Sequence, residues 1–391
     1  MGGMRHANRI SAAALRRALL DWYDAGHREL PWRSARDPYA IWVSEVMLQQ
    51  TQAARVAEYW PRFMAAFPTA SVLAGARADD VLAAWSGLGY YRRARMLHEA
   101  AALVVARGGL PRTASELRDL PGMGEYTAAA VASIAFGEAV PVLDGNAVRV
   151  FGRLLALKES HPTAARVREL RELAERLIDP ARPGDWNQAV MELGAVVCLP
   201  PAPRCSVCPI ARSCGARRSG APASYARPRR SAGTVRFAEA AAVIVRNGRV
   251  LMVPGPGAQG WWGGLWMLPR VAVTGAADAP ALLAEAVRRE FGPVCEFDGR
   301  PAPFRYSVTR HRVDGFAYRA VKVRGAVRRG SGARWLVLGE AVAAGMPAPD
   351  RRVLSGIIDA ARAPGRGAAR VPLTPRARRR TRAAPRATRR S

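Results

Sequence analysis

The sequence predicts a mainly α-helical first domain that is followed by a smaller domain of mixed α and β structure. From Ser11 to about Leu193, apolar residues recur at intervals of three and four, which is the spacing of an amphipathic helix. Strand-like runs appear only after a cysteine cluster and a stretch rich in Arg, Ser, Ala and Pro. The 391 residues are also too many for one ordinary domain. We therefore assign 1–215 to the first domain, 216–236 to a linker, 237–360 to the second domain and 361–391 to a tail.

Helices of the first domain are indicated by local signals. Leu15, Leu19 and Trp22 mark the apolar side of an early helix, and a similar pattern runs from 167 to 178. Thr113 and Glu116 form a capping box that opens a short helix, and the turn after it leads into a second helix from about 125 to 136.

The second domain shows both strand and helix signals. Asn247 and Gly248 are a strong hairpin signal between strand candidates over 240–245 and 249–253. Further strands are expected over 304–308 and 316–323, and a helix over 280–291. This domain is therefore predicted to be α+β.

The chain is strongly basic. It has 60 Lys and Arg against 31 Asp and Glu, a formal net charge of +29 and a pI near 11.4. Such an excess argues for a polyanionic partner, with nucleic acid ahead of an anionic membrane surface. Residues 361–391 carry eleven arginines and no acid, which predicts a disordered tail. The tail either contacts phosphates without sequence preference or remains an idle solvated segment, and composition leaves both alternatives open.

Composition also argues against secretion and against a membrane span. Five cysteines in a chain of this size do not make a disulfide-stapled secreted protein, and Arg16 and Arg17 interrupt any signal-peptide core. The longest charge-free run, 250–269, is broken by Pro254, Pro256 and five glycines. We expect a cytoplasmic, nucleoid-associated bacterial protein that has no membrane partner.

Four cysteines lie close together near the end of the first domain. Cys198, Cys205, Cys208 and Cys214 are separated by six, two and five residues, so their thiolates can converge on one metal centre. An all-sulfur ligand set suits either zinc or an iron–sulfur cluster, and the spacing alone leaves both open. Cys295 stands apart in the second domain and is expected to be a small buried hydrophobic residue.

Three further motifs have a structural and a functional interpretation. Gly122 and Gly124 form a Gly-x-Gly turn between two helices, where backbone N–H groups can approach a phosphate, although a plain tight turn is an equal alternative. Asp144 precedes a helical pattern, and an aspartate there is usually only an N-cap. Glu45 and Gln49 share one helix face with Gln52, which by periodicity alone would be a solvated polar face.

Taken together and in order, these motifs resemble the adenine DNA glycosylases of the MutY type, within the endonuclease III superfamily. The resemblance rests on Leu30-Pro31-Trp32-Arg33, on the string from Trp42 to Gln52, on Gly87-Leu88-Gly89-Tyr90-Tyr91, on the Gly-x-Gly turn and on the cysteine spacing, and it covers roughly residues 10–215. It implies a helix–hairpin–helix glycosylase fold, a [4Fe-4S] cluster held by the four cysteines, and a Nudix-like second domain. It also implies a monomer that acts on double-stranded DNA with A:8-oxoguanine or A:G mispairs.

The resemblance assigns roles to individual residues. Glu45 is expected to protonate the adenine and help activate water, and Asp144 to stabilise or transiently bond the sugar cation, the two-carboxylate logic of glycoside hydrolysis. The resemblance implies that Tyr126 and Asn146 support this pair and that Arg33 and Gln188 line the adenine pocket. The gap left by the flipped base is expected to be filled, and the opposite 8-oxoguanine held, by Gln50, Thr51, Leu88 and Tyr90. DNA is expected to bind at Gly122 and Gly124, and the lesion to be read by Thr309 beside Arg310 or His311. Tyr126 stands where bifunctional relatives carry a Schiff-base lysine, so a monofunctional glycosylase is predicted.

Three other functions are compatible with parts of the pattern. One is another enzyme of the superfamily, such as a thymine-mismatch glycosylase or a lyase, and another is a non-catalytic iron–sulfur DNA-binding protein. The third, a Nudix hydrolase, is disfavoured because Arg288-Arg289-Glu290-Phe291-Gly292 lacks the acid pair that holds Mg²⁺ in such enzymes.

Overall fold

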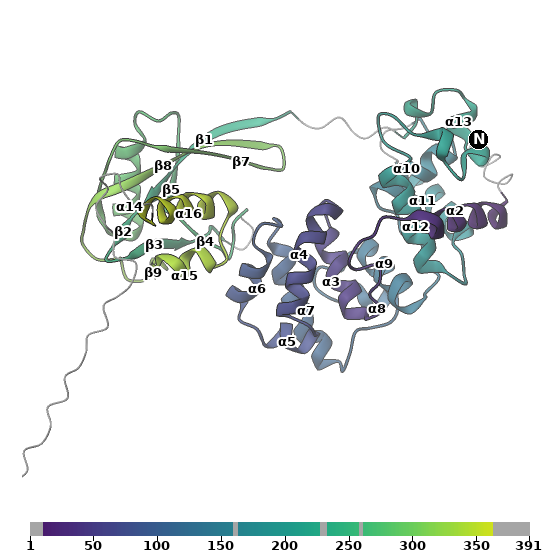
Figure 1. Cartoon of the computed structure of the whole chain (residues 1–391), viewed down its shortest axis with the longest axis horizontal. Helices are drawn as coiled ribbons and strands as arrows, with labels where there is room; N and C mark the ends of the chain where they lie inside the picture. The colour runs from purple at the N-terminus through teal and green to yellow at the C-terminus, as the bar shows by residue number, and fades with distance from the viewer. Residues whose placement is uncertain (1–10, 159–162, 227–232, 258–260, 363–391) are drawn as a thin grey trace, which may run out of the picture. The chain divides into compact units, whose positions relative to one another are not determined.

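The computed structural model describes residues 11–158, 163–226, 233–257 and 261–362, and it divides into two compact units (Figure 1). The first unit runs to Gly233 and the second starts at Thr234. Each unit is described by itself below.

The first unit is helical. Its elements are α2 (Ala12–Gly26), α3 (Pro38–Leu48), α4 (Ala53–Ala66), α5 (Ala70–Gly75), α6 (Ala78–Trp85), α7 (Arg92–Ala106), α8 (Ala114–Leu117), α9 (Glu125–Phe136), α10 (Gly145–Leu154), α11 (Ala164–Leu177), α12 (Pro183–Val196) and α13 (Gly215–Arg218), with short 3₁₀ turns at Cys205–Val207, Ala211–Ser213 and Pro222–Ser224.

Side-chain caps set where several of these helices begin. Asp37 accepts a hydrogen bond from Tyr39 N at the start of α3, and the predicted capping box of Thr113 and Glu116 is present at α8. Helix α3 is buried on nearly all sides, which explains its continuous apolar sequence. Helix α12 packs against α2, α9 and α10. Helices α2, α10, α11 and α12 enclose a core that includes Leu19 and Trp186.

The second unit combines two sheets with helices. Its elements are β1 (Val235–Val243), β2 (Val245–Arg246), β3 (Arg249–Pro254), β4 (Trp266–Met267), β5 (Arg270–Val273), α14 (Ala279–Phe291), β6 (Val294–Phe297), β7 (Ala302–Val308), β8 (His311–Arg324), β9 (Arg334–Val337), α15 (Leu338–Ala343) and α16 (Ala348–Arg362). One sheet has the order β5-β1-β8-β6 with β7 also paired to β8, and the other has the order β2-β3-β4 with β9 also paired to β3.

Strand β8 is the centre of the larger sheet. It runs parallel to β1, with Ala240 opposite Phe316, and antiparallel to both β7 and β6. It is longer than the predicted 316–323 because β7 pairs with its first half and β6 with its second half. The predicted hairpin at Asn247 and Gly248 is present, and both residues have positive φ, 52° and 74°, as a type I′ turn requires.

Three boundaries differ from the prediction. The segment 216–226, assigned to the linker, packs on the first unit: Ala216 is fully buried and Ala226 N donates to Leu157 O at 3.0 Å. Composition misses this because Pro, Ser and Ala are common in linkers and in short turns alike. The first strand of the second unit, β1, begins at Val235, two residues before the predicted start of that domain. Helix α16 reaches Arg362, two residues past the predicted end of that domain, and the rest of the predicted tail lies outside the described residues. Within the described ranges, no helix is both long and apolar enough to cross a membrane.

Candidate active site

Two carboxyl groups from different helices dominate the first unit's candidate site. Glu45 lies in the middle of α3 with 4% of its surface exposed. Burial raises the pKa of Glu45 to about 7; the hydrogen bond from Tyr126 opposes this shift and the negative charge of Asp144 adds to it. Glu45 is therefore poised to carry a proton near neutral pH.

Asp144 is held in place as the N-cap of α10. Its Oδ1 accepts from Ala147 N at 2.7 Å, and its Oδ2 accepts from Asn146 Nδ2 at 2.9 Å. The N-cap interpretation is thus correct, and it is compatible with catalysis because the cap fixes the carboxylate at a positive helix end.

Tyr126 on α9 donates a hydrogen bond to the carboxyl group of Glu45. Its hydroxyl lies 3.2 Å from Glu45 Oε2 and 3.2 Å from Met191 Sδ on α12. Burial and the two nearby carboxylates raise the pKa of Tyr126 well above 10, so the phenol stays neutral and can donate one hydrogen bond. The structure thus brings the predicted Glu45, Asp144, Tyr126 and Asn146 together.

Arg149 links this group to the cysteine segment. Its Nη2 donates to Asn146 Oδ1 and to Gly194 O, each at 2.7 Å, and its Nε donates to Cys198 O at 2.8 Å. One guanidinium thus joins the residue that supports Asp144 to the first of the four cysteines.

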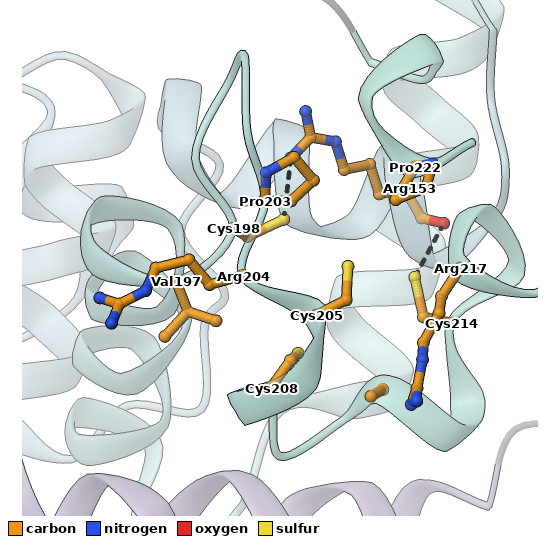
Figure 2. A pocket seen from close by; sticks show the side chains of 11 residues that line it. Arg153, Val197, Cys198, Pro203, Arg204, Cys205, Cys208, Cys214, Arg217 and Pro222 are labelled. Carbon is orange, nitrogen blue, oxygen red and sulfur yellow. Dashed lines mark hydrogen bonds between the residues drawn. The ribbon is translucent and has the colours of Figure 1, made fainter. Parts of the chain in front are cut away.

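The four cysteines line one small pocket (Figure 2). Arg153 crosses its rim, where Nη1 donates to Cys198 Sγ at 3.3 Å and its backbone O accepts from Cys214 Sγ at 3.5 Å (Figure 2). Burial raises the pKa of the Cys208 thiol to about 12, so its thiolate form requires a compensating cation. In the part of the chain that the structure describes, no three His, Cys, Asp or Glu side chains are grouped so as to hold a metal ion as they stand.

Arg33, a predicted pocket residue, is engaged with a buried acid. Its Nη2 donates to Glu192 Oε2 at 2.7 Å, and Arg28 donates to the two oxygens of the same carboxylate at 2.8 and 2.7 Å. Burial alone would raise the pKa of Glu192, but the hydrogen bonds from these two arginines outweigh it and hold the pKa at about 2. Gln188 is half-buried on α12, one turn before Glu192.

The predicted DNA-facing turns have unusual backbones. Gln50 and Tyr90 are exposed and have positive φ, 56° and 50°, whereas Leu88, two residues before Tyr90, is buried. Thr51 is half-buried and accepts a hydrogen bond from Arg93 at 3.0 Å.

The Gly-x-Gly turn precedes α9 as predicted. Gly122 has φ of +80°, a conformation that favours glycine, and a Cβ there would crowd Met96 Cβ at 3.1 Å. Gln49 Nε2 donates to Gly122 O at 3.2 Å, and Gly124 is the N-cap of α9. This geometry leaves the backbone open at a helix N-terminus.

The second unit places Thr309 at the turn between β7 and β8. It has φ of +51°, and its Oγ1 lies 3.4 Å from His311 Nδ1. The His311 ring packs against Trp261 with centroids 4.9 Å apart, whereas Arg310 is exposed at the turn.

Several residues of this site are missed by sequence reasoning. Three of them are arginines that donate mainly to backbone carbonyls: Arg93, Arg149 and Arg153. The other two are Met191, which accepts from Tyr126, and Glu192, which accepts from Arg33. Among these, a usable sequence signal exists for Glu192, which shares a helix face with Gln188.

Comparisons with known proteins find relatives among the DNA repair glycosylases. The family model of the HhH-GPD superfamily base excision DNA repair protein matches residues 43–176. The adenine DNA glycosylase of Rattus norvegicus is 51% identical over 217 residues, 52% of this chain and 42% of the rat protein. That of Mycobacterium tuberculosis is 43% identical over 216 residues, 54% of this chain and 70% of the mycobacterial protein. Among solved structures, the MutT protein of Methanosarcina mazei is 17% identical with a TM-score of 0.30, covering 34% of this chain and 100% of that protein.

The predicted fold class, a helical glycosylase domain followed by an α+β domain, is confirmed. The chain spans only about two fifths of the rat relative's length, but it matches more than two thirds of the mycobacterial relative at high identity. By this match, the chain belongs to the adenine DNA glycosylase family.

Proposed function

We propose that the chain is a monofunctional glycosylase that hydrolyses the N-glycosidic bond of adenine mispaired with 8-oxoguanine or guanine in double-stranded DNA. The observation that carries this proposal is the pairing of a buried Glu45, whose pKa is raised to about 7, with the N-capping carboxylate of Asp144. Adenine leaves poorly unless protonated, and the sugar it leaves becomes cationic, so the reaction needs one acid and one nearby negative charge.

Each group then has a definite task. The Glu45 carboxyl gives its proton to adenine, and the electron pair of the N-glycosidic bond departs with the base. Asp144 faces the positive charge that develops on the sugar. Water adds at the anomeric carbon and returns a proton to Glu45. The neutral Tyr126 hydroxyl orients the Glu45 carboxyl, and it offers no amine for the covalent route to strand cleavage.

We propose that Cys198, Cys205, Cys208 and Cys214 hold a [4Fe-4S] cluster. The donor set fits because four thiols line a single pocket and no oxygen or nitrogen ligand competes among its lining side chains except arginines, which cannot ligate. Arg153 donates a hydrogen bond to Cys198 Sγ and places a positive charge beside this sulfur. When bound, such a cluster supplies a cross-link between the cysteines and a redox-active centre.

The remaining proposals concern partners and place. The Gly122–Gly124 turn at the start of α9 suits a DNA phosphate, and the exposed Gln50 and Tyr90 suit the mispair. Thr309 with its neighbour His311 is proposed to read the base opposite adenine. We propose a monomeric, cytoplasmic, nucleoid-associated enzyme, in keeping with the net charge of +29.

The test uses duplexes with adenine opposite 8-oxoguanine, guanine or thymine, and one with thymine opposite guanine, each analysed with and without hot alkali. Breaks at adenine that appear only after alkali, opposite 8-oxoguanine or guanine, are expected, with a rate that falls as pH rises through about 7. Release of thymine instead, or breaks without alkali, would overturn the assignment.

Two variants test the roles. Glu45→Gln and Asp144→Asn should each abolish adenine release, and Asn preserves the cap because it is as good an N-cap as Asp. Asp37→Asn, the same change at the N-cap of α3, is the matched control and should retain activity. An active Glu45→Gln protein would contradict the mechanism.

A further inference from the structure

One buried arginine joins two turns that are far apart in sequence. Arg93 lies in the first turn of α7 with 8% of its surface exposed. Its Nη1 donates to the backbone oxygens of Val46, Met47 and Gln49 at 2.9, 2.7 and 2.5 Å. Its Nη2 donates to Gly89 O at 3.1 Å and to Thr51 Oγ1 at 3.0 Å.

The first of these contact sets caps a helix. The last carbonyls of α3, which ends at Leu48, have no partner within the helix, and a cation placed there also opposes the negative helix end. Burial lowers the pKa of Arg93 to about 10, so the guanidinium remains charged at neutral pH. Arg93 therefore fixes the end of the helix that carries Glu45.

The second set fixes the turn before α7. Gly89 O also accepts from Trp85 Nε1 at 3.1 Å, and the guanidinium lies over the rings of Trp85 and Tyr90, 5.3 and 5.4 Å from their centroids. The next residue, Tyr90, keeps 43% of its surface exposed in spite of this contact.

Each of the two turns contains one solvent-exposed residue with a strained backbone. Gln50 and Tyr90 are side-chain-bearing residues with positive φ, a conformation that persists only where the surroundings impose it. In each case the Arg93 side chain donates to residues next to the strained one, to Gln49 O and Thr51 Oγ1 on one side and to Gly89 O on the other. Two exposed side chains are thus held at a fixed spacing from each other and from Glu45.

We propose that Arg93 is a positioning residue that locks the turns at 48–51 and 87–91 into one rigid edge, which presents Gln50 and Tyr90 to the base pair from which adenine is extruded. This inference deepens the proposed function and rests on it. It assigns Arg93 to base extrusion rather than to bond cleavage, because its guanidinium contacts the turns and not the two carboxyl groups.

The test compares Arg93→Lys with the unchanged protein. Lysine keeps the charge but offers a single point of donation in place of the planar fork that reaches both turns. The matched control is Arg16→Lys, because Arg16 also caps a helix end, donating to Leu177 O and Arg176 O at 3.0 Å, away from the site. Thermal unfolding of all three proteins verifies that the fold is retained.

Two readouts separate positioning from a general structural role. Single-turnover adenine release is measured with adenine opposite 8-oxoguanine and with adenine opposite an abasic site, where no partner base has to be separated. Arg93→Lys should lose roughly 100-fold on the first duplex and much less on the second, since small misplacements of positioning groups cost rates of this order. When 2-aminopurine replaces the target adenine, its fluorescence should rise less on binding of Arg93→Lys than on binding of the unchanged protein or of Arg16→Lys.

Each alternative outcome has a defined meaning. Equal rates for Arg93→Lys and the unchanged protein on the paired duplex would overturn the inference, as would an equal loss on both duplexes. If the unchanged protein releases no adenine from either duplex, the proposed function fails. The fluorescence comparison then still decides on Arg93, because base extrusion does not require bond cleavage.

Discussion

At the residue scale, Glu45 illustrates how the same burial that serves catalysis costs stability. In the unfolded chain this carboxyl has its ordinary pKa of 4.5, whereas burial in the folded chain raises the pKa to about 7. Between these values the folded state binds more protons, so the free energy of unfolding falls as pH rises from 4.5 to 7. Glu45→Gln removes this dependence and should make the first unit more stable than the unchanged protein at pH 8, by on the order of 3 kcal/mol, with a smaller difference at pH 4.5.

Urea unfolding of both proteins at the two pH values measures this difference. The control is Glu58→Gln, because Glu58 is an exposed glutamate on α4 whose ion pair with Arg55 is solvent-exposed and contributes little to stability. A Glu45→Gln protein that shows no pH-dependent gain would mean that Glu45 is ionised in its pocket, and the acid role would be lost with it.

At the element scale, α12 is placed by two glycines. A Cβ at Gly194 would lie 2.6 Å from Asn146 Cβ, so α10 and α12 approach as closely as they do only because this residue has no side chain. Gly194→Ala should push α10 away and shift Asn146 together with Asp144. We expect a loss of about 1–3 kcal/mol in the free energy of unfolding, as for other overpacked sites, together with a fall in adenine release per folded molecule.

The second glycine of α12 supplies the control. A Cβ at Gly184 would lie 2.7 Å from Ile134 Cα, at the far end of α9 from Tyr126. Gly184→Ala should therefore lower the melting temperature to a similar degree and leave the single-turnover rate nearly unchanged. If both variants lose activity equally, the α10–α12 contact has no special role in holding Asp144.

Also at this scale, the sequence predicts elements better than it predicts the contacts between them. The capping box at Thr113, the hairpin at Asn247 and the cap at Asp144 depend on neighbours within four residues, so their local signals suffice. The roles of Arg93 and Arg149 depend on backbone carbonyls more than forty residues away, and a carbonyl leaves no trace in the residue type. For the same reason the polar pattern around Glu45 allowed a solvated face, although the fold buries this residue.

At the scale of the whole molecule, the two units have separate cores and the proposed cluster belongs to one of them. The cysteine pocket is built from the first unit alone, and the second unit's cores are formed by its own strands and helices. Chains of this kind unfold in more than one step, and a bound metal centre stabilises only the unit that holds it.

Calorimetry of Cys208→Ser should therefore show a selective effect. Serine is nearly the same size but is a poor ligand for iron, so the variant should lose the visible absorbance of the cluster, and the transition of the first unit should fall by more than about 5 °C. The transition of the second unit should stay where it is. Cys295→Ser gives the reverse pattern, because Cys295 is buried in the second unit and a hydroxyl there lacks the apolar fit of the thiol. A Cys208→Ser protein that keeps its absorbance and both transitions would show that the four cysteines do not hold a common centre, and one that shifts both transitions together would show that the two units unfold as one.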